Sequence, residues 1–244
     1  GRTAGFIGCQ RVFDTNKIGV EDSTGLGYST NELQGTFIAG NDFNYVMTLA
    51  NAIKSANQYN IVSCSSTAIE QSLVNLQPYA MVDIIFGLQR NDGYSRQSYK
   101  TFTPSMQKAV RQYTNHGGAL LISGAYVGSD MTTATDQDFL ASVLKCKHER
   151  AIADSTGTVN GMGTTLQYYH QLNGDHYAAT HTDILNPLSP AFATLRYDAG
   201  GNAAIAYQGS DYRALTMGFP FECIVERTKR NAIMQGLLQF LIKE

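Results

Sequence analysis

Short apolar runs alternate with amphipathic stretches over the first 145 residues of the chain. The runs occur at 36–40, 60–65 and 81–88, and the last lies within the stretch 116–130. Runs of this length, bounded by polar and glycine-rich turns, are typical of buried strands. The last run follows the pair Gly117-Gly118 and leads into a turn of small and polar residues. Residues 123–130 are therefore expected at the carboxyl end of a parallel strand, where ligands bind in open α/β sheets.

The stretches between these runs predict helices. Asn41 or Asp42 can cap a helix whose apolar residues at 43–53 fall on one face, and a second helix is expected near 68–76. Thr103-Pro104 should open a helix that Gly117 ends, since proline fits the first helical turn and glycine the position after the last. Residues 136–145 and 226–241 predict further helices. The turn-rich stretch 14–29 predicts a long functional loop or lid.

The pattern changes after residue 146. Short alternating runs at 166–170, 203–207 and 213–218 are separated by Gly, Asn, Asp and Pro, which predicts antiparallel strands. Strand–helix alternation followed by such strands predicts an α/β fold: a doubly wound, mostly parallel sheet flanked by helices, with an antiparallel extension in the C-terminal half. No linker interrupts the pattern, so residues 1–244 are expected to form one domain with an irregular segment at 1–35.

Composition narrows the choice of partners. Hydrophobic residues make up 43% of the 244 residues and charged residues 16%, which suits a sizeable core without long solvated tails. A formal net charge of −2 and the lack of a basic cluster argue against nucleic acid, and no apolar run is long enough for a membrane span. A surface rich in Ser, Thr, Asn, Gln and Gly favours a secreted, periplasmic or cell-surface bacterial protein, and the start at Gly1 suggests a mature or trimmed chain.

The cysteines and histidines give no recognisable metal or redox motif. The spacing of Cys9, Cys64, Cys146 and Cys223 is too wide for one, so buried free thiols are expected, although a disulfide stays open for an exported protein. None of the five histidines has ligand spacing typical of a metal site. No phosphate-cradling glycine loop of a standard form is present. We therefore expect neither a metal nor a cofactor.

Two polar segments should meet at the predicted sheet edge. The loop at 89–96 follows the strand at 81–88, and the turn at 123–130 follows the next one. Tyrosine rings could stack on sugar faces there, while charged side chains bond hydroxyl groups. Each of these residues also has an alternative role that involves no ligand. The loop at 89–96 could simply be solvated, Ser123 could hydrogen-bond the backbone, and Glu222 could face the dipole of the last helix. The predicted ligand-binding residues are Arg90, Asp92, Tyr94, Ser123, Tyr126, Asp130 and Glu222.

Two stretches carry a family resemblance. Residues 117–128, Gly-Gly-Ala-Leu-Leu-Ile-Ser-Gly-Ala-Tyr-Val-Gly, resemble the nucleophile-strand region of class I glutamine amidotransferase-like domains. Residues 217–222, Met-Gly-Phe-Pro-Phe-Glu, resemble the C-terminal end of that fold. With 25–29, 38–43, 62–65 and 86–93, the set resembles the amidotransferase-like domain of large secreted bacterial proteins often labelled xanthan lyase. The resemblance covers most of 25–242 and implies a flavodoxin-like fold and further domains in a larger parent chain.

The chain departs from that family where the family does chemistry. An active amidotransferase would resemble Gly-x-Cys-x-Gly at the turn and His-x-Glu near the last helix. Ala125 or Tyr126 stands in place of the cysteine, Phe219 or Phe221 in place of the histidine, and only Glu222 remains. Without a thiolate and its base there is no acyl-enzyme route, so glutaminase activity is not expected.

Three functions remain open from the sequence. The first is a non-catalytic, pseudoenzyme-like module of a secreted polysaccharide-associated protein, which binds carbohydrate or another domain. The second is a polysaccharide lyase or hydrolase, in which Tyr94 or Tyr126 would act as base and Arg90 would neutralise a uronate carboxylate. The third is a scaffold or dimerisation domain. The sequence does not separate the three.

Overall fold

The computed structural model describes residues 45–91, 99–171, 173 and 176–242. Among our expectations, the strand at 36–40, the loop at 14–29, the irregular segment 1–35 and the residues Asp92 and Tyr94 lie outside this part of the chain. The described helices and strands, in chain order, are α3 (Tyr45–Ala56), α4 (Ser66–Glu70), β1 (Met81–Gly87), α5 (Pro104–Asn115), β2 (Ala119–Gly124), α6 (Ala134–Phe139), the π-helix η1 (Leu140–Leu144), β3 (Cys146–Ile152), β4 (Thr158–Gly161), β5 (Thr164–Gln167), β6 (Thr182–Pro187), β7 (Phe192–Tyr197), β8 (Asn202–Gln208), β9 (Arg213–Met217), the 3-10 helix η2 (Phe221–Cys223) and α7 (Arg227–Leu241).

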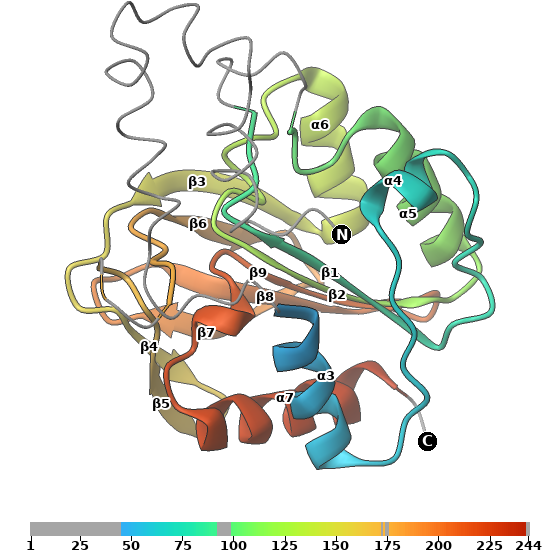
Figure 1. Ribbon diagram of the computed structural model, residues 1–244. Coiled ribbons are helices and arrows are strands. Elements are labelled where there is room, and N and C mark those ends of the chain that lie inside the picture. Colours follow the sequence, from blue (N-terminus) through green and yellow to red (C-terminus); the bar gives the residue numbers. More distant parts are fainter. Residues whose placement is uncertain (1–44, 92–98, 172, 174–175, 243–244) are drawn as a thin grey trace, which may run out of the picture.

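The described strands form one mixed sheet of seven strands and a separate pair. The order of the large sheet is β1-β2-β9-β8-β7-β4-β5, and β3 pairs with β6 (Figure 1). Only the pairs β1–β2 and β2–β9 are parallel; the other four pairs of the large sheet are antiparallel, as is β3–β6. The prediction of a doubly wound, mostly parallel, flavodoxin-like sheet is therefore wrong, because β9 enters between β2 and β8 and most strands run antiparallel.

Helices cover both faces of the sheet at its β1–β2–β9 end. In Figure 1, α3 and α7 lie on one side of these strands, and α4, α5 and α6 lie on the other. The alternation of side chains along β2 explains why both faces are apolar: Leu121 enters the core under α3 and α7, while Leu120 and Ile122 enter the core under α5 and α6. All six residues of β2 are buried. No described helix is long and apolar enough to cross a membrane.

Local signals in the sequence placed α5 and α7 well. Thr103 caps α5 by accepting a hydrogen bond from the Met106 amide, and Pro104 occupies the first turn. Gly117 follows with φ +85°, a left-handed conformation that glycine adopts without strain. The helix predicted at 226–241 is α7, which begins one residue later. These elements depend on contacts within a few residues, which the sequence displays directly.

Other elements differ from the prediction. Residues 60–65 form no strand, and Val62 is 67% exposed. The helix predicted near 68–76 is the single short turn α4, capped by Ser65 and ended by Gln71. The helix predicted at 136–145 is α6 followed by the π-helical turn η1, which ends at Lys145 in a left-handed conformation (φ 55°). Side-chain caps are present here too, at Ser65 for α4 and at Thr133 for α6, but neither helix exceeds six residues, so a cap alone does not set the length of a helix.

Candidate functional site

The carboxylate of Asp183 holds the turn after β2 in place through two backbone hydrogen bonds. Asp183 on β6 is fully buried, and its Oδ2 accepts hydrogen bonds from the backbone N–H groups of Gly128 (2.7 Å) and Ser129 (2.8 Å). On the adjacent strand β3, His148 Nε2 lies 3.2 Å from Asp183 Oδ1, without hydrogen-bond geometry. Asp183 thus ties the two-stranded sheet to the loop at the carboxyl end of β2.

An arginine and a tyrosine form the exposed part of this edge. The guanidinium carbon of Arg90 lies 4.6 Å from the ring centroid of Tyr126, within the range of a cation–π contact. Arg90 is exposed and Tyr126 is half-buried. Burial raises the pKa of the Tyr126 phenol; the carboxylate of Asp183 adds to that rise, and the guanidinium of Arg90 opposes it. Tyr126 therefore stays a neutral ring and hydrogen-bond donor, with a cation over its face.

Asp130 organises the two ends of the neighbouring loop. Its carboxylate accepts hydrogen bonds from the backbone amides of Asn91 (3.1 Å) and Thr101 (2.8 Å), and Lys100 Nζ donates to its backbone carbonyl (2.8 Å). Burial raises the pKa of this carboxyl, while those two amides oppose the rise. The side chain of Asp130 therefore holds Asn91, the residue next to Arg90, in place.

Two carboxyl groups lie buried beneath the same end of the sheet. Glu222 on η2 is 1% exposed and accepts a hydrogen bond from the hydroxyl of Tyr177 at 2.8 Å. Burial raises its pKa to about 7. Burial also raises the pKa of Asp83 on β1, and the nearby carboxyl of Glu222 raises it further. Within the described chain no partner reaches either Asp83 oxygen, Glu222 Oε2 or the Ser123 hydroxyl, so burial favours the protonated form of both carboxyl groups.

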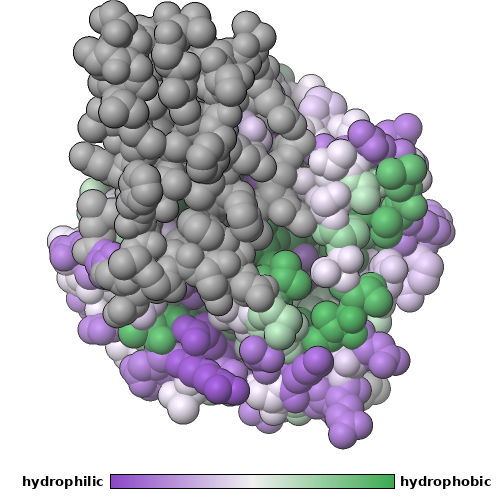
Figure 2. All heavy atoms as spheres, in the orientation of Figure 1, coloured by the Kyte–Doolittle hydropathy of each residue, from purple (hydrophilic) through white to green (hydrophobic). Residues whose placement is uncertain are grey.

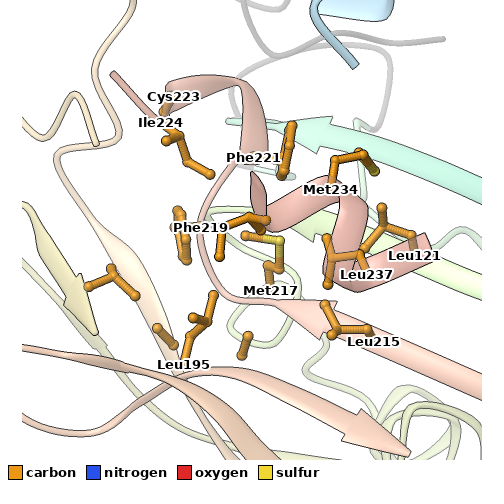
Figure 3. Close-up of a cluster of buried hydrophobic side chains, with 14 of the residues drawn as sticks. Leu121, Leu195, Leu215, Met217, Phe219, Phe221, Cys223, Ile224, Met234 and Leu237 are labelled. Carbon is orange, nitrogen blue, oxygen red and sulfur yellow. The ribbon is translucent and has the colours of Figure 1, made fainter. Parts of the chain in front are cut away.

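Buried apolar side chains of the hydrophobic core occupy the positions where an active amidotransferase would have its cysteine and histidine. Ala125 at the turn is fully buried, and so are Phe219 and Phe221, which Figure 3 shows among the side chains of Met217, Leu215 and Met234. Cys223 is a buried free thiol whose pKa is raised, chiefly by burial and also by Glu222. A thiol with a raised pKa is a poor nucleophile. The described residues at this edge thus offer charge, hydrogen bonds and an aromatic face.

The seven predicted ligand-binding residues divide into three groups. Arg90 and Tyr126 meet at the surface, and Asp130 supports them from within the loop. Ser123 and Glu222 are buried beneath. Asp92 and Tyr94 lie outside the described residues. The role of all seven as ligand contacts stays a prediction. Glu222 does not cap the last helix, because Glu226 occupies that position.

Sequence reasoning missed Asp83, Asp183 and His148 as members of this site. Asp83 carried a readable signal, because a carboxylate in the middle of the apolar run at 81–88 is costly to bury. Asp183 and His148 carried none, since strands far along the chain bring them to the turn after β2. Within the described chain, no group of three His, Cys, Asp or Glu residues could hold a metal ion.

Removing the Asp183 carboxylate should loosen the turn. We expect Asp183→Ala to lower the free energy of unfolding by about 2 kcal/mol, because the amides of Gly128 and Ser129 lose a buried acceptor. Asp183→Asn keeps an acceptor oxygen in the same place and should cost less than about 1 kcal/mol. Urea unfolding of both variants measures the difference. Equal losses for the two would show that the two amide bonds contribute little.

The fold occurs in solved structures at low sequence identity, whereas neither protein-family models nor curated proteins match the chain. A β-galactosidase from the Antarctic haloarchaeon Halorubrum lacusprofundi aligns with a TM-score of 0.50 and 17% identity over 86% of this chain and 28% of its own. Gan42B, a GH42 β-galactosidase from G. stearothermophilus, aligns with a TM-score of 0.50 and 9% identity over 87% and 28%. A cytoplasmic protein from Salmonella typhimurium aligns with a TM-score of 0.54 and 11% identity over 81% and 87%.

These similarities concern the fold alone. The chain spans about 28% of the length of each of the two β-galactosidases and most of the length of the Salmonella protein. The resemblance to class I glutamine amidotransferase-like domains is corrected by this result: the neighbours are portions of β-galactosidases and a small cytoplasmic protein, and the sheet is mostly antiparallel. The chain is similar in fold to a portion of each of the two β-galactosidases and to most of the Salmonella protein.

Proposed function

We propose that this chain is a carbohydrate-related module that binds a sugar, without catalysing its conversion, at the surface formed by Arg90 and Tyr126. The observation that carries the proposal is the guanidinium of exposed Arg90 over the half-buried ring of Tyr126, at the carboxyl end of β2. Aromatic faces pack against the apolar faces of sugar rings, and a guanidinium donates several hydrogen bonds to hydroxyl or carboxylate oxygens. The fold similarity to portions of two β-galactosidases supports the same class of ligand.

The support around the pair favours binding of a preorganised kind. Asp130 fixes Asn91 beside Arg90, and Asp183 fixes the turn that carries Tyr126. Side chains held in place before binding lose less conformational entropy when a ligand arrives. The proposal includes an acidic sugar as the preferred ligand, because Arg90 offers a cation. A secreted, periplasmic or cell-surface location stays a prediction from composition.

A thermal-shift screen tests the proposal. The ligands are neutral oligosaccharides, uronic-acid oligosaccharides, glutamine and divalent metals, since a ligand that binds only the folded protein raises its melting temperature. We expect a shift with uronic-acid oligosaccharides and a loss of affinity of about tenfold in Arg90→Gln, equivalent to one charge-assisted hydrogen bond. Arg196→Gln removes an exposed arginine on β7 and should leave the affinity unchanged.

The outcomes separate the functions. A shift that Arg90→Gln and Tyr126→Leu both reduce supports sugar binding at this surface. A shift that neither variant changes would place the sugar elsewhere and overturn the assignment of the site. Release of unsaturated product or reducing ends from the shifted sugar would identify an enzyme rather than a binding module.

A further inference from the structure

A groove runs along the outer edge of β1. It has a volume of about 380 Å³, and its described walls come from α3, α7, the segment 59–66, α4 and both faces of β1. Leu49 and Ile53 line it on the α3 side, and Ile69 and Met106 line it on the other. In Figure 2, hydrophobic side chains gather on the face between the α3–α7 layer and the α4–α5 layer. The groove is therefore apolar on both sides of the sheet plane.

The floor of this groove is an open strand edge. β1 pairs with β2 on one side, and no described strand pairs with it on the other. Every second residue of an edge strand points its N–H and C=O groups outward, which makes the edge a template for another strand. Residues 60–66 line the far side of the groove from residues 80–86 without pairing to them. A slot with one open strand edge, that of β1, thus lies between two described segments.

The position of residues 36–40 along the chain makes them a suitable occupant of this slot. Residues 36–40 read Thr-Phe-Ile-Ala-Gly, a short run with β-branched and aromatic side chains that suits a strand buried on both faces. Only residues 41–44 separate this run from Tyr45, the start of α3. Tyr45 packs on Tyr177, which bonds Glu222 just beyond the carboxyl end of β9. α3 therefore begins at the end of the sheet where a strand parallel to β1 would finish.

We propose that the groove on the outer edge of β1 is the docking site for residues 36–40 of the same chain, which add there as a strand parallel to β1. The connection from this strand to β1 runs through α3 and α4 and supplies the helical crossover that parallel strands require. Docking extends the sheet between β1 and the segment 60–65 and covers the apolar walls on both faces. It also brings new backbone groups to the buried carboxyl of Asp83, which has no partner among the described residues.

Disulfide scanning of the full chain tests this placement. Ile38→Cys is combined in turn with Val82→Cys, Asp83→Cys, Ile84→Cys and Ile85→Cys. Disulfides require Cα atoms within about 7 Å and side chains on the same face. We expect cross-linking at least about tenfold faster either at positions 82 and 84 or at positions 83 and 85, and not at both, because neighbouring side chains of a strand point to opposite faces.

The scan needs a background without competing thiols and a control cysteine outside residues 36–40. Cys9 and Cys64 are replaced with serine, since Cys64 lines the groove. Thr15→Cys, in place of Ile38→Cys, should show no alternation along β1. Cross-linking with no alternation, or no cross-link at any position, would overturn the proposal. Disulfide-linked dimers whose yield rises with protein concentration would also overturn it and assign the edge to a second copy of the chain.

Hydrogen exchange gives an answer that needs no engineered cysteine. Ile38→Pro removes one backbone N–H donor and so disrupts hydrogen bonding along a strand, whereas Ile38→Val keeps the donor and a β-branched side chain. We expect the proline variant to raise amide exchange in β1 by at least about tenfold while the valine variant leaves it unchanged. Equal exchange in β1 for the two variants would contradict the docking of residues 36–40.

Discussion

We expect the free energy of unfolding to fall by about 2 to 3 kcal/mol as the pH rises from 5 to 8, and Glu222→Gln to remove most of that fall. The pKa of Glu222 is raised from its usual 4.5 to about 7 by burial. Between those two values the folded protein binds a proton that the unfolded chain has already released. The stability contributed by the protonated carboxyl is therefore complete below pH 4.5 and is lost as the pH rises through 7.

Glutamine is the matched replacement because it keeps the shape and the acceptor for the hydroxyl of Tyr177. The variant should match the wild type at pH 5 and exceed its stability at pH 8. Burial and the nearby Glu222 also raise the pKa of Asp83, so Asp83→Asn combined with Glu222→Gln should reduce the decline further than Glu222→Gln alone. Urea unfolding at constant ionic strength measures this. A parallel decline for wild type and Glu222→Gln would show that Glu222 ionises freely in the folded protein.

A second large effect is expected at Gly218, just after β9. A Cβ atom there would lie 2.1 Å from the backbone carbonyl oxygen of Asp183. The backbone has little room to move, because the Gly218 amide donates to Ala203 at 2.8 Å and the Asp183 amide donates to the Gly218 carbonyl at 2.9 Å. We expect Gly218→Ala to lower the free energy of unfolding by about 3 kcal/mol and the melting temperature by about 10 °C.

Gly236 provides the matched control for that substitution. It lies within α7, and a Cβ there would meet only the terminal methyl of Met162, a flexible side chain that is 38% exposed. Gly236→Ala should therefore be neutral or stabilise by up to about 1 kcal/mol, since alanine has the higher helix propensity. Thermal unfolding of the two variants side by side makes the comparison. Equal stability of both would mean that β6 and the end of β9 separate at little cost.

The sequence predicted elements well where their determinants are local. The cap at Thr103, the proline that follows it and Gly117 specify α5 within a few residues, and the uninterrupted apolar run specifies β2. The sequence does not show which strands pair with one another in the sheet. Nothing in the run that became β9 shows that it pairs with β2 on one side and β8 on the other. That choice depends on how all strands pack together, which is why the fold class was predicted wrongly.

In the candidate site, too, the sequence predicted some contacts and could not predict others. Arg90 and Tyr126 could be brought together from the sequence, because each follows the carboxyl end of one of two neighbouring parallel strands. The burial of Glu222 could not, because its surroundings come from Tyr177 and from β1, far away along the chain. Asp83 was visible as a charge inside an apolar run. Its chemistry became apparent only when the structure placed the carboxyl of Glu222 nearby.

The place of β2 in the sheet has a consequence for the synthesis of the chain. β2 is fully buried, with β1 on one side and β9 on the other, and Leu121 pairs with Leu215. As the chain leaves the ribosome, β1 and β2 emerge together, but β9 follows only after the whole antiparallel half has been made. Until then one edge of this largely apolar strand has no partner, and such edges promote aggregation of incomplete chains. The nascent protein therefore needs its last strand before its most apolar one is protected.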